Sequence, residues 1–168
     1  MKAIIVYESM FGTTKKVAEA IAENLNNIEK IETVIKTAKD VDPMEVLDYD
    51  LILIGSPNHM GGPTRGFKKF IGKLEKTGLK GKKGATFDTY VRKNINKAVR
   101  KMERKITEKV PGLELITHGL SIKVGGISGP VLEEELPKCK EFANTLINKD
   151  ESLRRRLFLN PENETHKL

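Results

Sequence analysis

The sequence alternates between short apolar runs and longer segments with helical periodicity, and this alternation narrows the choice of fold. Residues 2–7 and 51–57 are the clearest runs, in which Ile, Leu and Val follow one another. Such runs are typical of strands buried on both faces of a parallel sheet. From Thr14 to Leu25, apolar side chains instead recur every three or four positions. That spacing predicts a helix that packs one face against the sheet.

The same alternation continues through the chain, with turn residues between the elements. The pattern predicts strands at 31–37 and 84–90, a short helix at 43–47, a helix opened by Pro63, and a helix with Ile95, Ala98, Val99, Met102 and Ile106 on one face. It also predicts a fifth strand over 113–116 and 120–124, with a kink or bulge at His118-Gly119. The last predicted helix begins at Pro130 and is kinked or restarted at Pro137.

Strict alternation with short connections predicts an α/β fold, a doubly wound three-layer sandwich around a five-stranded parallel sheet. Ligands of such sheets bind outside the carboxyl ends of the strands. We assign residues 1–149 to one domain and treat residues 150–168 as a C-terminal extension. The extension combines three consecutive arginines, 154–156, with leucines on either side. This composition leaves open an interaction arm that supports a homodimer, a contact with a membrane surface, or disorder.

The charge balance is basic, with 30 Lys and Arg against 23 Asp and Glu and a formal charge of +7. This balance favours acidic partners. Lysines occur on every predicted helix and no RNA-binding fingerprint is visible, which disfavours nucleic acid. The apolar runs are far shorter than the ~20 residues that a membrane span needs. A single cysteine, Cys139, and the lack of a signal peptide pattern predict a cytoplasmic protein.

The first predicted loop at the carboxyl ends of the strands has the composition of a phosphate cradle. Its residues are Ser9, Met10, Phe11, Gly12, Thr13 and Thr14. Hydroxyl groups, a glycine and the free N–H groups of the following helix can bind an anion there. The loop lacks both GxxxxGK[ST] and GxGxxG, so a monophosphate is favoured over a triphosphate or a dinucleotide. The alternative is that Thr13 or Thr14 is only the N-cap of the helix.

Two further loops directly follow predicted strands and should face the same crevice. The second loop contains Ser56, Pro57, Asn58, His59, Met60, Gly61 and Gly62, and the third contains Phe87, Asp88, Thr89 and Tyr90. For Met60 and Tyr90, packing under the loop and exposure on it remain alternatives to ligand contact. The three histidines are far apart in sequence, so no metal site is predicted. No GxSxG motif occurs and Cys139 has no nucleophile motif around it, so covalent hydrolysis is disfavoured and no catalytic residue is assigned.

Four segments of the chain resemble the flavodoxin family, and together they cover roughly residues 2–147. They are YESMFGTTKKVAEAIA, GSPNHMGGPTRGFKKFI, KKGATFDTYV and GISGPVLEEELPKCKEFA. The resemblance, which is nearest to the flavodoxin domains of flavodiiron proteins and to small flavodoxin-like proteins, implies strand order 2-1-3-4-5. It implies FMN as cofactor, with its phosphate on Ser9–Thr14 and its ring between the second and third loops. Phe11 and the absence of tryptophan depart from the family pattern, so Tyr90, Met60 and then His59 are the stacking candidates.

The resemblance favours a redox protein in which FMN passes electrons between partner proteins. Because the chain is basic, we expect an acidic partner such as a ferredoxin. One alternative is an enzyme, an FMN-dependent reductase that transfers electrons from NAD(P)H to a quinone. Another is a binding module that keeps the fold without flavin.

Overall fold

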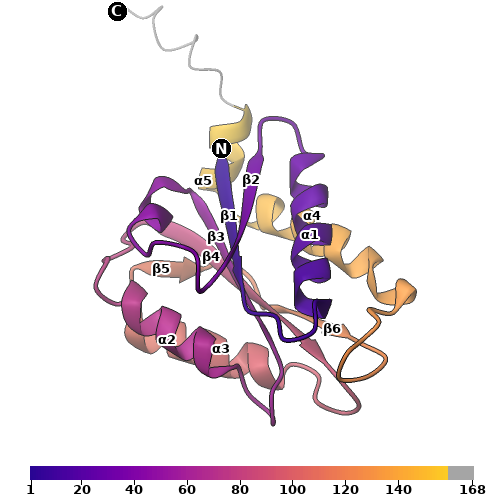
Figure 1. The fold of residues 1–168 in the computed structure, drawn as a ribbon. Coiled ribbons are helices and arrows are strands. Elements are labelled where there is room, and N and C mark those ends of the chain that lie inside the picture. The colour runs from indigo at the N-terminus through magenta and orange to yellow at the C-terminus, as the bar shows by residue number, and fades with distance from the viewer. Residues whose placement is uncertain (159–168) are drawn as a thin grey trace, which may run out of the picture.

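The computed structural model describes residues 1–158, which form a parallel sheet with helices on both of its faces (Figure 1). The strands are β1 (Lys2–Tyr7), β2 (Glu32–Thr37), β3 (Leu51–Pro57), β4 (Lys82–Tyr90), β5 (Leu113–Leu115) and β6 (Leu120–Lys123). The helices are α1 (Thr13–Asn26), α2 (Arg65–Leu74), α3 (Lys97–Lys109), α4 (Pro137–Lys149) and α5 (Glu151–Phe158). Short 3-10 helices cover Glu45–Asp48 and Glu133–Glu135.

The strand order is β2-β1-β3-β4-β5, and all pairs are parallel, which confirms the predicted doubly wound fold. The predicted fifth strand is divided into two strands that both pair with β4. Strand β5 pairs with Lys82–Gly84, whereas β6 pairs with Phe87–Tyr90. Gly119 lies in the interruption, where an added Cβ would lie 2.4 Å from Thr86 Oγ1. The chain therefore needs a glycine at this position.

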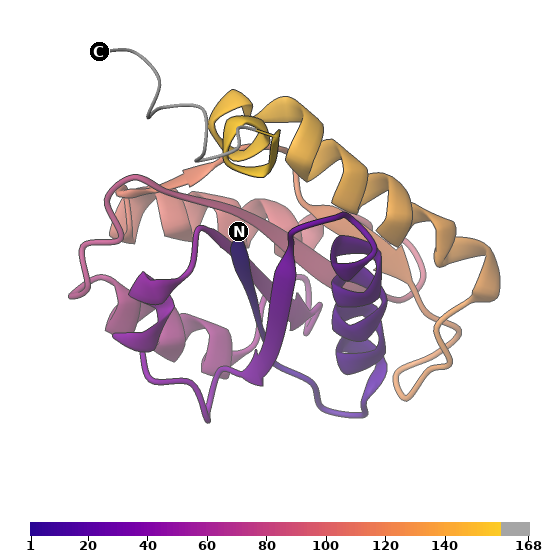
Figure 2. The ribbon, with the colours of Figure 1, turned by 90° about the horizontal axis from the view of Figure 1, so that it is seen from above.

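The sheet separates two apolar cores. Helices α1, α4 and α5 pack on one face, and α2 and α3 pack on the other (Figure 2). Ile5 and Leu53 belong to the first core, and Ile4 and Ile52 belong to the second. Successive residues of β1 and β3 thus point to opposite cores, as the uninterrupted apolar runs predict.

Three helix starts differ from the prediction. The second helix begins at Arg65 rather than Pro63, and the side chain of Thr64 accepts the N–H of Phe67 as its cap. Helix α3 begins at Lys97, after Asn96 in the left-handed conformation, so Ile95 lies outside the helix and half exposed. The last of the three, α4, begins at Pro137 rather than Pro130.

The segment before α4 is a loop because its backbone bonds to itself and to the end of β6. The Gly125 N–H donates to the Pro130 carbonyl over 2.8 Å, and Val124 forms an isolated bridge with Val131. Pro137 occupies the first helical position of α4, where its missing N–H has no consequence. The predicted restart at Pro137 is therefore the true start.

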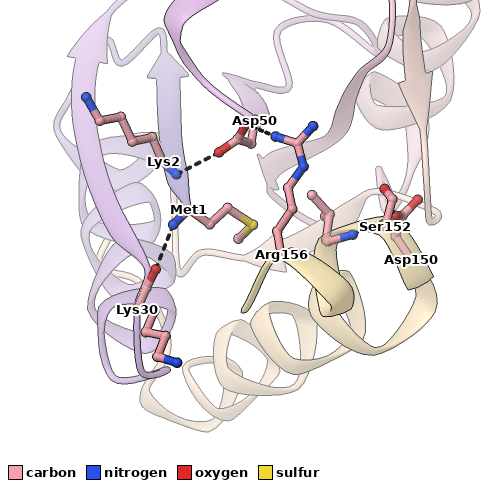
Figure 3. A network of polar contacts seen from close by, with 8 residues as sticks. Met1, Lys2, Lys30, Asp50, Asp150, Ser152 and Arg156 are labelled. Atoms are coloured by element: carbon pink, nitrogen blue, oxygen red, sulfur yellow. Dashed lines mark hydrogen bonds and ion pairs between the residues drawn. The ribbon is translucent and has the colours of Figure 1, made fainter. Parts of the chain in front are cut away.

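Helix α5 packs on the domain at the edge where the strands begin. Its Leu153 and Leu157 are fully buried, and Lys83 Nζ lies 3.2 Å from Asp150 Oδ2 at the start of the helix. Arg156 pairs with Asp50, whose other oxygen accepts the Lys2 N–H over 3.0 Å (Figure 3). The first part of the predicted extension is thus joined to the domain. Residues 159–168, which carry the rest of that prediction, lie outside the described residues.

Candidate functional site

A hollow of about 340 Å³ lies at the carboxyl ends of the strands. Four loops form its wall, and they follow β1, β3, β4 and β6. The lining residues are Met10, Phe11, Thr13, Pro57, Asn58, His59, Met60, Thr89, Tyr90, Val91, Asn94, Val124 and Ile127. The place of the hollow agrees with the general rule for ligands of doubly wound sheets.

The rim of this hollow carries large apolar side chains that are open to solvent. Met10, Phe11, Met60 and Ile127 are 57%, 55%, 93% and 78% exposed. Within residues 1–158 the other large exposed apolar side chains are Met44, Ile95, Leu136 and Phe158, none of which lines the hollow. A gathering of exposed apolar groups around one concave site marks a place that a ligand or partner covers.

The start of α1 provides a site for an anion beside this rim. Gly12 is the N-cap residue, with φ of +85°, and no side chain caps the helix. The alternative that Thr13 or Thr14 is the N-cap is therefore wrong. An uncapped first turn presents N–H groups and the positive end of the helix dipole. The Gly12 N–H itself donates to Ser9 Oγ over 3.0 Å, which closes the loop against the helix.

Thr14 connects the first loop to the third. Its side chain is fully buried, and its Oγ1 shares a hydrogen bond of 2.9 Å with Thr89 Oγ1. Thr13, in contrast, lines the hollow. Of the two threonines, only Thr13 therefore faces the space where a ligand would lie.

Asn58 holds the second loop in place with three hydrogen bonds. Its backbone N–H donates to the Thr89 carbonyl over 2.8 Å, and its Nδ2 donates to the Asn94 carbonyl over 3.0 Å. Its Oδ1 accepts the Gly61 N–H over 2.9 Å. Ser56, which is buried behind this loop, accepts the Thr64 N–H over 3.0 Å. These bonds join the loop to the neighbouring parts of the chain.

The tip of the second loop is a tight turn. His59 and Gly62 exchange backbone hydrogen bonds of 2.7 and 3.1 Å, and the two residues between them have positive φ, +52° at Met60 and +80° at Gly61. This is the pattern of a type I′ turn, which favours glycine and disfavours methionine. The turn raises the Met60 side chain to the rim of the hollow.

The third loop contributes less to the hollow than predicted. Phe87 is fully buried in the core of the α1 and α4 face, and an added Cβ at Gly55 would lie 2.1 Å from its ring. Asp88 is also fully buried. Only Thr89 and Tyr90 of this loop line the hollow. All four residues belong to β4, and only its last two, Thr89 and Tyr90, reach the hollow, whereas the side chains of residues 87 and 88 point to the two faces of the sheet inside the domain.

Asp88 does not line the hollow but binds the elements that surround it. Its Oδ2 accepts the Val99 N–H of α3 over 2.9 Å, and its Oδ1 accepts the Ser121 hydroxyl of β6. Burial raises the pKa of Asp88 to about 6, although the bonds from Ser121, Val99 and Ala98 act in the opposite direction. The carboxyl group thus holds the start of α3 against β4 and β6.

Nine of the predicted residues line the hollow, and eight lie behind it or beside it. The nine are Met10, Phe11, Thr13, Pro57, Asn58, His59, Met60, Thr89 and Tyr90. The eight are Ser9, Gly12, Thr14, Ser56, Gly61, Gly62, Phe87 and Asp88. Four further lining residues were not predicted: Val91, Asn94, Val124 and Ile127.

A sequence signal exists for the last two of these four residues. The glycines and proline of Gly125-Gly126 and Gly129-Pro130 directly follow the predicted strand 120–124. Such residues mark a loop, and the loop after the fifth strand lies beside that after the fourth. The apolar pattern instead predicted a helix start at Pro130, within this loop.

Comparison with known proteins agrees with this geometry. The chain matches the flavodoxin domain family over residues 4–120. It belongs to this family. An uncharacterised protein of Methanocaldococcus jannaschii is 30% identical over 166 residues, which cover 88% of this chain and 99% of that protein. A longer protein of the same organism is 30% identical over 151 residues. That alignment covers 88% of this chain and 36% of the relative, so this chain spans about a third of its length.

Solved flavodoxin structures share the fold. Oxidised flavodoxin 2 from Bacillus cereus is 31% identical and aligns with a TM-score of 0.76, over 89% of this chain and 100% of its own. A flavodoxin from the domain Archaea is 26% identical and aligns with a TM-score of 0.75, over 92% and 99%. In residues 1–158 of this chain, no helix is long and apolar enough to cross a membrane.

Proposed function

We propose that this protein binds FMN and carries electrons between partner proteins. The observation that carries the proposal is the hollow at the carboxyl ends of the strands, which combines an uncapped helix start with an exposed apolar rim. A phosphate and a flat aromatic ring require these two features side by side. Membership of the flavodoxin domain family supports the same ligand.

The two parts of FMN would contact different residues. The N–H groups of the first turn of α1 would hold the phosphate, together with the hydroxyl groups of Ser9 and Thr13. The ring would lie among Met10, Phe11, Met60 and Tyr90, whose apolar surfaces exclude water from it. When bound, FMN supplies the electron chemistry, and no side chain of the protein has to act as acid or base.

The proposal extends to partners and location. The positive charge of the protein favours an acidic redox partner such as a ferredoxin, and its single cysteine favours a cytoplasmic location. Two apolar side chains of residues 150–168, Leu153 and Leu157, are buried in their own domain and are therefore not available for a homodimer contact. Phe158 stays exposed and available for such a contact, and residues 159–168 lie outside the described residues.

The first test is the visible absorption spectrum of the purified protein, before and after addition of FMN and removal of the excess by gel filtration. We expect flavin bands that elute with the protein, and tighter binding of FMN than of riboflavin, which lacks the phosphate. Thr13→Asp should lower FMN affinity at least tenfold, because its carboxylate would repel the phosphate. Thr145→Asp on α4, which does not line the hollow, is the matched control. A protein that rejects FMN at micromolar concentration would overturn the proposal.

A second assay separates a carrier from a reductase. The FMN-loaded protein is mixed with NADPH and a quinone, and the absorbance of NADPH is followed. A carrier accepts electrons from dithionite and does not oxidise NADPH over many turnovers. Sustained oxidation of NADPH would instead establish the reductase alternative.

A further inference from the structure

The basic charge of the protein is concentrated in one part of the chain. Residues 58–110 hold sixteen Lys and Arg against four Asp and Glu, a formal charge of +12. The whole chain has +7, so the other residues together are acidic, with −5. Most of the basic residues of this segment belong to α2 and α3, which lie side by side on one face of the sheet (Figure 1). The excess of positive charge is thus concentrated on these two helices rather than spread evenly over all helices.

Seven Lys and Arg side chains lie around the turn at 59–62, of which Lys105 is partly buried, and we refer to the six exposed ones as the basic surface. They are Arg65 and Lys68 of α2 and Lys97, Arg100, Lys101 and Arg104 of α3. They line two shallow depressions of about 580 and 570 Å³. Met60 lines both depressions and also the hollow of the candidate flavin site. A molecule on the basic surface would therefore touch the rim of that hollow.

The charges of the basic surface are not neutralised within the described chain. Among residues 1–158, none of the six side chains takes part in an ion pair. Glu103 of α3 is occupied elsewhere, because its Oε1 accepts the Gly119 N–H over 2.6 Å. Glu108 is the one acidic residue among those that line the two depressions. Like charges held this close repel one another unless an anionic group lies opposite them.

We propose that the basic surface docks an acidic electron-transfer protein, and that this partner exchanges electrons with the flavin across Met60. The inference rests on the proposed function, since the flavin site is what the surface adjoins. A protein partner fits better than nucleic acid, because no Phe, Tyr or Trp lines either depression to stack on a base. The depressions are open and their charges lie on two helices, which suits an extended acidic face. Such complementarity acts mainly through the rate of association and the orientation of the complex.

The test compares two triple variants with the same net charge. Lys97→Glu, Arg100→Glu and Arg104→Glu together reverse the basic surface, and all three side chains are exposed. Lys140→Glu, Lys149→Glu and Arg154→Glu reverse three exposed charges on α4 and α5. Lys101 is kept because its chain packs against Gly62 in the turn. The probes are two small acidic proteins, a 2[4Fe–4S] ferredoxin and a rubredoxin, and the measurements are calorimetric binding and stopped-flow electron transfer at low and high salt.

We expect reversal of the basic surface to weaken binding of at least one probe tenfold or more at low salt. Electron transfer between that probe and the protein should slow by a similar factor. The control variant should stay within twofold of the wild type, and high salt should remove the difference. Equal effects of both variants, or no binding of either probe at low salt, would overturn the inference. The inference would also be overturned if a single-stranded or duplex oligonucleotide bound at physiological salt, charge reversal weakened that binding, and neither probe bound.

The same proteins distinguish this inference from the proposed function. FMN affinity is titrated for the wild type and both variants, and we expect three equal values because the six side chains lie outside the flavin hollow. Failure to bind FMN would count against the proposed function alone, since calorimetric binding of the probes does not need the flavin. Normal FMN binding without reversal-sensitive docking would count against the basic surface alone.

Discussion

Asp88 is a buried carboxyl group whose ionisation should be visible in the stability of the protein. Its pKa rises from 3.8 to about 6 on folding, chiefly because of burial. Between these values the folded state binds more protons than the unfolded state, so this residue makes stability fall as pH rises. A shift of this size corresponds to a contribution of about 3 kcal/mol to the free energy of unfolding. This contribution is present at low pH and is lost once the pH exceeds the folded pKa.

Asp88→Asn removes this titration while keeping the local bonds. The amide oxygen can accept the Val99 N–H, and the amide nitrogen can donate to Ser121 Oγ. Chemical denaturation at pH 4, 5.5 and 7 should show the wild type losing stability relative to Asp88→Asn as the pH rises. The comparison cancels the carboxyl groups that both proteins share. A stability difference that stays constant over this range would contradict the assigned pKa.

Substitution of alanine for Gly61 and for Gly72 compares two positions with free space around an added Cβ but different backbone conformations. An added Cβ would meet nothing within 4 Å at either position. Gly61 has φ of +80° in the turn beside the hollow, whereas Gly72 is a helical residue of α2. We expect Gly61→Ala to lower the free energy of unfolding by about 1 kcal/mol and Gly72→Ala to raise it by about 0.5–1 kcal/mol. Urea denaturation measures both. Effects of the same sign would show that the turn is not in the left-handed conformation.

Helix α5 should contribute to stability and not to the proposed flavin site. It packs at the edge where the strands begin, opposite the loops that form the hollow (Figure 1). Leu157→Ala should lower the free energy of unfolding by about 2–5 kcal/mol, because it empties a fully buried position. Phe158→Ala, one residue further on and mostly exposed, should change it by less than about 0.5 kcal/mol.

Denaturation midpoints and FMN titration are measured on both variants of α5. We expect both to keep the FMN affinity of the wild type. A Leu157→Ala protein that is as stable as Phe158→Ala would place α5 outside the core. A folded Leu157→Ala protein with weakened FMN binding would show that the two edges of the sheet are coupled.

Periodicity predicted the sheet and most helices because their burial is reflected in the residue types. The runs of β1 and β3 and the stripe of α1 illustrate this relation. The strand order came from the family resemblance, since a pattern of apolar residues does not say which strands are neighbours. Helix starts were less predictable: Asn96 adopts a left-handed conformation that no apolar pattern signals, and Pro130 belongs to a loop bonded to β6.

The candidate site was predicted best where loops begin cleanly after strands. The end of β3 was predicted because a proline and two glycines follow its apolar run, and four residues of the predicted second loop line the hollow. Phe87 and Asp88 do not line the hollow, although the third loop was predicted to contain them. The predicted strand 84–90 already included both residues, and its pairing with β3 and β6 keeps them inside the domain. Ile127 was not predicted to line the hollow, because this requires the loop after β6 to lie next to the loops after β1 and β3, which the sequence pattern does not indicate.

At the scale of the whole molecule, the uneven charge should control how the protein meets charged surfaces. The net charge of +7 conceals +12 in residues 58–110 and −5 elsewhere. A molecule with separated charges adsorbs on a polyanionic surface through its basic side, so its retention depends on that side more than on net charge. The reversal variant (K97E/R100E/R104E) and the control variant (K140E/K149E/R154E) both lower the formal charge from +7 to +1.

Cation-exchange chromatography at pH 7 should therefore separate two variants that have the same formal charge. We expect the wild type to elute at the highest salt, the control variant at somewhat lower salt, and the reversal variant far earlier, because it loses the clustered charges that hold the protein in one orientation. Circular dichroism checks that both variants are folded. Identical elution of the two variants would mean that net charge alone governs adsorption, and that the basic residues of α2 and α3 do not act as one surface.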